Sequence, residues 1–129
     1  MNLKEELSGI SEYFSPKVIG ELNDVYVKLV KIKGDIIPWH SHEKEDELFY
    51  VLKGSLLFEI EDEVPFMLND GDMYIVPRGI NHRISAKEEC HIMLVENKST
   101  KHTGEVTSEI TKSIQEQNEL FLSQNKFQL

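Results

Sequence analysis

The feature of this sequence that most constrains its fold is a succession of short β-prone runs separated by turn-forming residues. The runs are rich in Val, Ile, Leu, Phe and Tyr, and they cover residues 25–32, 36–40, 47–52, 55–61, 64–68, 72–76 and 90–95. The segments between them contain Gly34, Lys53-Gly54, Glu61-Asp62, Asn69-Asp70-Gly71 and Pro77-Arg78-Gly79. Many short strands joined by regular turns predict an all-β sandwich or barrel.

Two of these runs indicate which faces are buried. In residues 55–61, Leu56, Phe58 and Ile60 alternate with the other positions, which predicts one buried face and one mostly wet face. In residues 47–52 both faces are apolar, because Phe49 and Val51 share a face with Glu47 while Leu48, Tyr50 and Leu52 form the other. An apolar outer face must be covered by a second sheet, a terminal helix or a twin subunit. For a small strand-rich domain, this pattern favours a two-fold homodimer.

The two ends of the chain read as helices rather than strands. Leu3, Leu7, Ile10 and Phe14 recur at helical spacing, which predicts a short amphipathic N-terminal helix packed on the barrel. Near the other end, the spacing of Ile110, Ile114 and Phe121 after Ser108 predicts a C-terminal helix. We therefore expect one domain over residues 1–129, with a core barrel at about 25–96 and a linker and helical tail at 97–129.

Charge and hydropathy exclude several classes of function. The 129 residues carry a net charge of −9, which leaves no basic face for nucleic acid or anionic lipid. The longest apolar runs are far shorter than the roughly 20 residues that span a bilayer. The first residues, MNLKEELSGI, lack the profile of a secretory signal, and a single cysteine, Cys90, fits a reducing compartment. These features predict a cytoplasmic protein that binds neither nucleic acid nor membrane.

The acidic residues concentrate in one part of the chain. Residues 43–72 contain ten carboxylates against two lysines, so nearly the whole charge imbalance lies there. Most of these acids flank apolar runs, as residues at hairpin turns and edges do, and this indicates a solvated rim. Attraction of a divalent cation is the weaker alternative.

The strongest functional signal is His40-Ser41-His42, followed by Glu47 and, forty residues after His42, by His82. Residues i and i+2 of a strand point to the same side, so His40 and His42 present two imidazoles to one point. Glu47 opens the next run, and the turn at 77–79 delivers His82 from a distant strand. Three neutral imidazoles and one carboxylate predict a site for one divalent transition metal with open positions for water, substrate or dioxygen.

The predicted metal centre indicates the class of small molecule that binds there but not the identity of the metal. A divalent ion with Glu47 ionised leaves one positive charge, which favours a small anionic or oxygen-chelating molecule. Fe, Mn, Ni, Co, Cu and Zn all accept this ligand set. For the other candidates a structural role is favoured: His91 and His102 as structural histidines, Trp39 as a packing residue, and Arg78 as a solvent-facing turn residue rather than an anion contact.

These segments resemble the two sequence motifs of the cupin superfamily. The fixed positions of the two motifs are occupied by Gly34, His40, His42, Glu47 and Gly54, and by Gly71, Pro77, Gly79 and His82. The second motif usually closes with an Asn, where this chain has Ala86. That Asn does not ligate the metal in the family pattern, so the departure concerns local strand-end geometry. The resemblance implies a double-stranded β-helix, or jelly-roll barrel, with the metal near the middle of its mouth.

More narrowly, the chain is similar to small single-domain cupins described as related to mannose-6-phosphate isomerase. The segments DELFYVLKG, IVPRGINH and HTGEV carry this similarity. Members of that group largely lack an assigned reaction, so the resemblance indicates a fold and a site rather than a substrate.

Two classes of function remain open. The first is a metal-dependent enzyme that either oxygenates a small carboxylate- or enol-bearing compound or isomerises a sugar-like one. The second is a non-catalytic barrel that binds a metal or a small ligand, for sensing or storage. No general base can be placed from the sequence, which favours chemistry at the metal.

Overall fold

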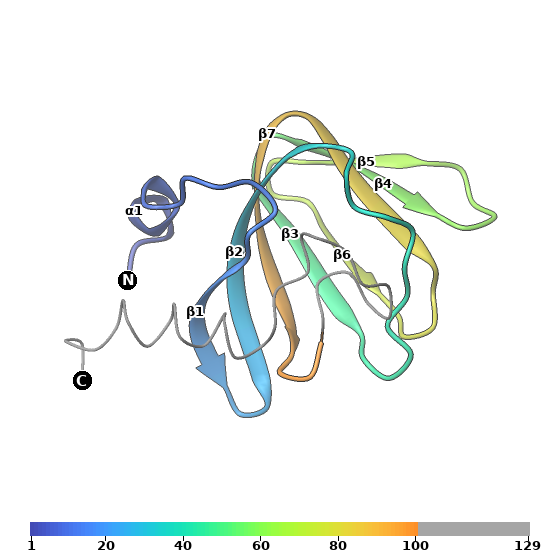
Figure 1. Ribbon diagram of the computed structural model, residues 1–129, viewed down its shortest axis with the longest axis horizontal. Coiled ribbons are helices and arrows are strands. Elements are labelled where there is room, and N and C mark those ends of the chain that lie inside the picture. The colour runs from blue at the N-terminus through green and yellow to red at the C-terminus, as the bar shows by residue number, and fades with distance from the viewer. Residues whose placement is uncertain (101–129) are drawn as a thin grey trace.

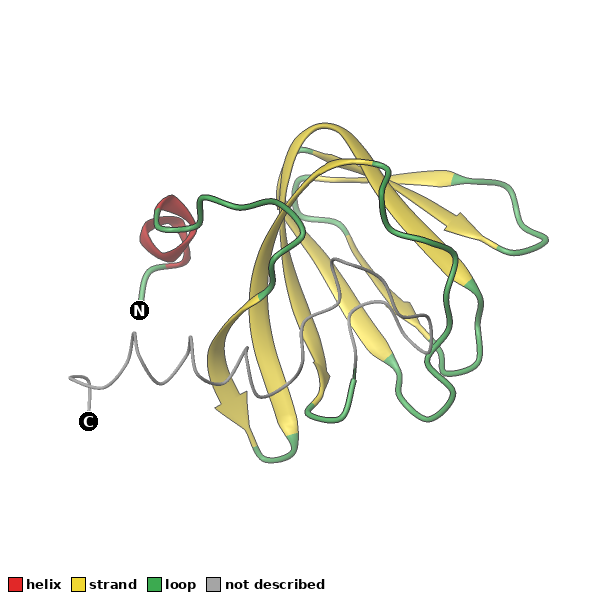
Figure 2. Cartoon of the chain, in the orientation of Figure 1, coloured by secondary structure: helices red, strands yellow, loops and turns green. Residues whose placement is uncertain are grey.

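Strands supply nearly all the regular structure of this chain. The computed structural model describes residues 1–100, and the predicted C-terminal helix lies outside them. Along the chain the elements are α1 (Leu3–Ser8), β1 (Lys17–Leu22), β2 (Val25–Gly34), β3 (Glu47–Lys53), β4 (Ser55–Ile60), β5 (Phe66–Asn69), β6 (Met73–Val76) and β7 (His82–Asn97). Figure 2 shows these strands in yellow and α1 in red. The predicted all-β jelly-roll class, with a short N-terminal helix, is confirmed.

One long strand, β7, joins the two layers of the fold. Its C-terminal half lies between β2 and β3 in an antiparallel sheet of order β1-β2-β7-β3-β6. Its first residues pair instead with β4, which pairs in turn with β5. Figure 1 shows β7 running from one layer into the other.

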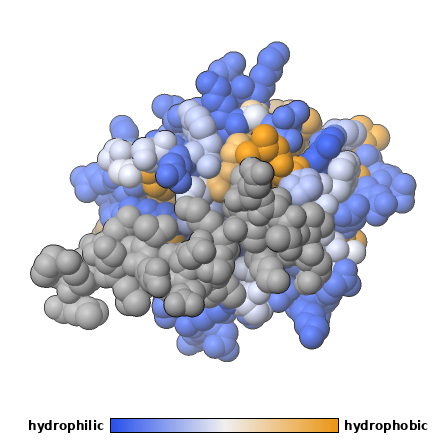
Figure 3. All heavy atoms as spheres, viewed as in Figure 1, coloured by the Kyte–Doolittle hydropathy of each residue, from blue (hydrophilic) through white to orange (hydrophobic). Residues whose placement is uncertain are grey.

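The core lies between the layers and follows the alternation of the strands. In β4, Leu56, Phe58 and Ile60 are buried, as predicted. In β3, Glu47, Phe49 and Val51 are buried, while Leu48, Tyr50 and Leu52 on the other face are half-buried. Hydrophilic residues dominate the surface in the view of Figure 3.

The N-terminal helix is shorter than the sequence spacing predicts. Asn2 caps α1 by accepting a hydrogen bond from the Glu5 N–H at 3.0 Å, and the helix ends at Ser8 before Gly9. Leu7 and Ile10 pack with Ile19 and Leu29 in a second apolar cluster, against which Leu52 also packs. Phe14 leaves the helical pattern with a φ of 56° and enters the main core. The helix therefore covers one end of the outer face of β3.

Two strand predictions differ from the structure. Residues 36–40 form no strand, because only His40 makes a bridge there, to His82. Residues 17–22, which the sequence pattern left out, form β1 as an edge strand on β2. Among the described residues, no helix has the length and hydropathy needed to cross a membrane.

Candidate metal centre

Backbone hydrogen bonds, rather than a shared strand, bring two of the predicted ligands together. The loop between β2 and β3 carries His40, and His82 opens β7. The His40 N–H donates to the His82 carbonyl at 3.0 Å, and the His82 N–H donates to the His40 carbonyl at 2.8 Å. Directly opposed residues of this kind hold their side chains close. The expected strand is therefore replaced by a two-residue bridge that serves the same purpose.

The turn after β6 fixes the third histidine and the start of β3. The Gly79 N–H donates to the carbonyl of His42 at 2.8 Å, and the Arg78 N–H donates to Asp46 Oδ1 at 2.8 Å. Gly79 has a φ of 78°, a region that residues with a Cβ rarely adopt. The Arg78 side chain is exposed. The turn thus holds the loop around His42 through its backbone.

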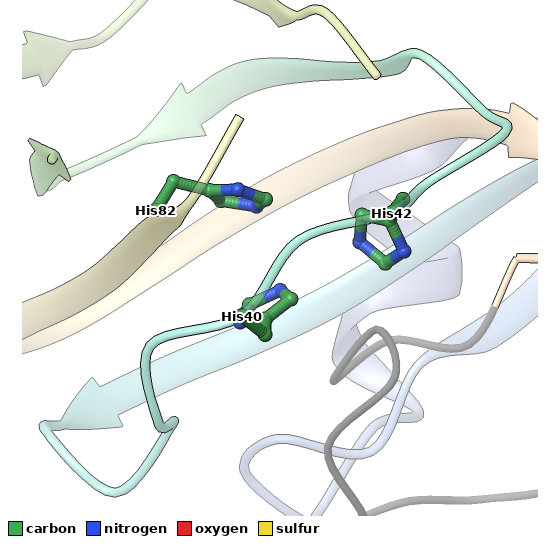
Figure 4. A group of neighbouring side chains, drawn as sticks. All are labelled: His40, His42 and His82. Carbon is green, nitrogen blue, oxygen red and sulfur yellow. The ribbon is translucent and has the colours of Figure 1, made fainter. Parts of the chain in front are cut away.

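The three imidazoles converge inside the barrel. One ring nitrogen of each of His40, His42 and His82 lies within 4.8 Å of the others, and all three residues are at most 4% exposed. Figure 4 shows His40 and His42 on one loop, with His82 reaching the same region from β7. Three ring nitrogens grouped in this way could hold a metal ion.

Two of the rings are held in the tautomer that leaves Nε2 available to a metal. His40 Nδ1 lies 2.8 Å from the Pro38 carbonyl, and His82 Nδ1 lies 2.9 Å from the Ile80 carbonyl. A carbonyl only accepts, so both Nδ1 atoms carry the proton and both Nε2 atoms keep a lone pair. Orientation of a ligand by a hydrogen bond from its other nitrogen is the usual support for a metal-binding histidine. The residues present therefore fit a metal ion.

The carboxylate of Glu47 faces the same group. Its Oε1 lies 3.5 Å from His42 Nε2 and 3.7 Å from His82 Nε2, and Glu47 is 2% exposed. These separations are too long for good hydrogen bonds. They leave Glu47 beside the three rings, where the sequence spacing predicts a fourth ligand.

The environment sets the charge of these groups. Burial lowers the pKa of His40 from 6.5 to about 4, and the neighbouring His82 adds to this shift. Burial by itself would raise the pKa of Glu47, but contacts with Glu96, His42 and His82 hold that pKa well below its usual value. A neutral imidazole beside an ionised carboxylate is the protonation state that binds a divalent metal.

Two functional candidates were missed by the sequence analysis. Lys28 and Glu96 form an ion pair of 2.8 Å, and both side chains are completely buried. Glu96 also lies directly opposite Glu47 in the pairing of β7 with β3, and burial together with the neighbouring Glu47 raises the pKa of Glu96 well above its usual value. The alternation of the strands contains the signal, since Lys28 shares its face with Tyr26 and Val30. A charged residue on the apolar face of a buried strand indicates an internal partner.

A small apolar space adjoins the histidines. Its volume is about 20 Å³, which is room for about one water-sized molecule. Its lining is apolar apart from His40 and Glu47, and it includes Phe14, Ile37 and Phe49. Phe58 stacks on the ring of His82 at a centroid distance of 6.0 Å. The centre is therefore enclosed by hydrocarbon on its inner side.

The remaining candidates lie away from this centre. His91 Nε2 contacts Glu89 Oε2 at 2.6 Å on the surface, and His102 lies outside the described residues. Trp39 is partly exposed and lies under the guanidinium of Arg83 at 5.0 Å. Cys90 is buried, and burial raises the pKa of its thiol to about 11. None of these described side chains joins the histidine group.

Comparisons with known proteins agree with this geometry. Residues 29–96, more than half of the chain, match the family described as Cupin domain. The Bacillus subtilis protein YdbB, itself uncharacterized, is 33% identical over 97 residues, which are 75% of this chain and 85% of YdbB. A solved cupin-2 domain containing protein from Shewanella frigidimarina is 40% identical, with a TM-score of 0.72, over 75% of this chain and 93% of that one. An acireductone dioxygenase of Phaeosphaeria nodorum is 35% identical over 79 residues, which are 58% of this chain and 41% of that enzyme.

Proposed function

The chain belongs to the cupin family, and from this premise we propose that it is a metal-dependent enzyme of the dioxygenase type, acting on a small anionic or oxygen-rich metabolite. The observation that carries the proposal is the group of three buried imidazoles, with the buried carboxylate of Glu47 beside two of them. Without a cation, burial of these four polar groups together is costly. A bound cation coordinates these groups and so offsets the cost of burying them.

In the proposed centre, ring nitrogens of His40, His42 and His82 and the carboxylate of Glu47 hold one divalent transition metal. When bound, such an ion supplies a Lewis acid and, for a redox-active metal, a site that activates dioxygen. The chain's own part is to orient the rings toward the ion. The carbonyls of Pro38 and Ile80 do this for His40 and His82.

Local charge defines the substrate class. A divalent ion with Glu47 ionised gives the centre one net positive charge, inside a protein of net charge −9. An anionic or chelating oxygen is therefore attracted to the open positions of the metal.

The apolar space beside the histidines favours dioxygen chemistry over isomerisation. A space of about 20 Å³ has room for about one water-sized molecule, which is enough for dioxygen but not for an organic substrate of either reaction, and apolar cavities of this kind stay dry. An isomerase needs a further group that moves a proton between neighbouring carbons. The described lining of this space offers only His40 and Glu47 as titratable side chains, and both are assigned to the metal. The dioxygenase name of one relative gives independent support.

The test separates turnover from simple binding. Purified full-length protein is loaded anaerobically with Fe(II), Mn(II), Ni(II) or Zn(II), and metal content is measured by elemental analysis. We expect one ion per chain. Oxygen uptake is then followed with a panel of small enediols, 2-oxo acids and hydroquinones, with the Zn(II) form as the redox-inactive control.

Oxygen uptake by at least one redox-active form, together with an oxygenated product in mass spectrometry, would support the proposal. One bound ion with no uptake from any compound would contradict the enzyme and leave a binding or sensing barrel. No bound ion in any form would contradict the metal centre itself.

A further inference from the structure

The most deeply buried charges in the described chain lie next to the proposed centre but outside its ligand set. Lys28 Nζ lies 2.8 Å from Glu96 Oε1, and the exposed fraction of both side chains is 0%. Bringing two ions out of water costs several kcal/mol each, and an apolar pair of similar size is often as stable or more so. The strand pairing does not require this pair, because it uses backbone groups. The presence of the two charged residues therefore calls for a role other than strand pairing.

The strand register places Glu96 between the lysine and the proposed ligand. Glu96 of β7 lies directly opposite Glu47 of β3 on one side and opposite Tyr26 of β2 on the other. Lys28 stands two residues after Tyr26 on the same inner face. The Glu96 carboxyl forms the ion pair with Lys28, and Glu96 and Glu47 are buried side by side on the inner face of the sheet. The three side chains thus form one continuous buried contact that ends at the histidines.

We propose that Lys28 and Glu96 are positioning residues that hold the carboxylate of Glu47 toward the three imidazoles. Two adjacent carboxyl groups in a buried site repel each other when both are ionised. The ammonium of Lys28 offsets that repulsion and holds Glu96 in place. Glu96 in turn binds the Glu47 carboxyl group, whose Oε1 then faces His42 and His82 at 3.5 and 3.7 Å. This inference rests on the proposed metal function.

The positioning role differs from a purely structural one in what it predicts for metal binding. A fixed Glu47 loses little rotamer freedom when an ion binds, whereas a Glu side chain without such partners has to be ordered by the ion itself. Partners that orient a metal ligand are typically worth about 10- to 100-fold in metal affinity. A pair that only supports the sheet changes unfolding and leaves metal affinity unchanged.

The experiment compares the parent with Glu96→Gln, Glu96→Leu, Lys28→Met and the double variant Lys28→Met/Glu96→Leu. A Gln at position 96 can still donate to Glu47 and accept from Lys28, whereas Leu does neither. Lys98→Met is the matched control, since it removes an exposed Lys–Glu pair, Lys98 with Glu21 at 3.0 Å. Each protein is titrated with Co(II) in competition with a chelator, its visible Co(II) spectrum is recorded, and urea unfolding is measured without metal.

We expect Glu96→Leu, Lys28→Met and the double variant to bind Co(II) about 10- to 100-fold more weakly and to change its visible spectrum. Glu96→Gln and Lys98→Met should stay within about threefold of the parent, well inside the range that such partners control. If the single variants do not fold, the Co(II) affinity of the double variant tests the positioning role, because that variant leaves no unpaired charge. Parent-like affinity and spectrum in every folded variant that lacks the pair would overturn the inference. A parent that binds no Co(II) would overturn the proposed metal function, whereas failure of the positioning role would leave the parent's binding intact.

Discussion

At the scale of single residues, the centre depends on which nitrogen of each ring carries the proton. The carbonyls of Pro38 and Ile80 hold the Nδ1 protons of His40 and His82, so the Nε2 atoms of both rings are left as acceptors. His82 also contacts the rings of Phe49 and Phe58. Loss of one histidine ring should therefore remove a metal ligand and leave the surrounding apolar side chains in place.

We expect His82→Ala to leave the chain folded and to strip the metal. Circular dichroism should report the parent's strand content, while elemental analysis should find well under one ion per chain. His91→Ala is the control, because His91 lies on the surface against Glu89. Equal metal content in His82→Ala and in the parent would contradict the assignment.

The metal-free protein should lose stability as the pH falls through the range in which His40 would titrate when unfolded. Burial lowers the pKa of His40 from 6.5 to about 4, so between these values the unfolded chain takes up a proton that the folded chain does not. The free energy of unfolding is therefore highest above pH 6.5. For this one group it should fall by about 2 kcal/mol between pH 7 and pH 5.

Urea unfolding of the metal-free parent and of His40→Gln at both pH values measures this effect. Other groups titrate in the same range, so the difference between the two pH dependences isolates His40. An equal loss of stability in the two proteins would show that His40 is not held neutral by the fold.

The spacing of His40, His42, Glu47 and His82 in the sequence was sufficient to predict which residues meet. It could not show how they meet, because residues 36–40 are as β-prone as the true strands yet form a loop. Lys28 was overlooked for a related reason. The alternation of β2 marks Lys28 as inward-facing, but its partner is visible only in the structure, because Lys28 lies opposite Leu94 in the pairing with β7 and reaches Glu96 on the diagonal.

At the scale of elements, β7 holds the two layers together and so fixes both ends of the site. It carries His82 where it pairs with β4 and Glu96 where it pairs with β3. The turn at Gly54, between β3 and β4, lies against the bend of β7. A Cβ on Gly54 would meet the Glu89 carbonyl oxygen at 3.0 Å and the Cys90 Cα at 3.1 Å. The space at this turn therefore controls how closely the layers approach.

Gly54→Ala should destabilise the fold more than Gly34→Ala does. The two glycines have nearly equal φ values, +104° and +105°, but a Cβ on Gly34 meets nothing within 4 Å. The cost of a positive φ, about 1–2 kcal/mol, is thus common to both variants. The contact with β7 adds about 1–3 kcal/mol for Gly54 alone. Urea unfolding measures both losses, and equal losses would show that the hairpin does not press on β7.

The elements themselves were only partly predictable from the sequence. The alternation in residues 55–61 gave β4 almost to the residue. The run at 90–95 marked only the apolar end of β7, because residues 87–89 are exposed and charged where the strand bends between layers. A pattern based on burial cannot follow a strand through a stretch that turns outward.

At the scale of the whole molecule, β3 serves both the interior and the surface. Its inner face carries Glu47, Phe49 and Val51, while on its outer face Leu48 lies opposite Ile75 and Tyr50 opposite Met73 of the edge strand β6. Met73 and Ile75 are 55% and 47% exposed. α1 packs against Leu52 but not against these four residues. Among the described residues, nothing covers this part of the outer face of β3 and β6. We expect a second copy of the chain to pack there. Because the site lies on the inner face of β3, such a dimer would leave it open.

We therefore expect the full-length protein to be a homodimer through the outer face of β3 and β6. Light scattering at micromolar concentration should give twice the chain mass of 15.0 kDa. A lysine at position 75 would have to be buried without a partner in such an interface, which costs several kcal/mol, so Ile75→Lys should give the monomer mass. Val64→Lys is the control, because Val64 is 85% exposed on the β4–β5 hairpin, and it should leave the dimer intact. A parent that scatters only as a 15.0 kDa species would contradict the dimer, and a dimer insensitive to Ile75→Lys would place the interface elsewhere.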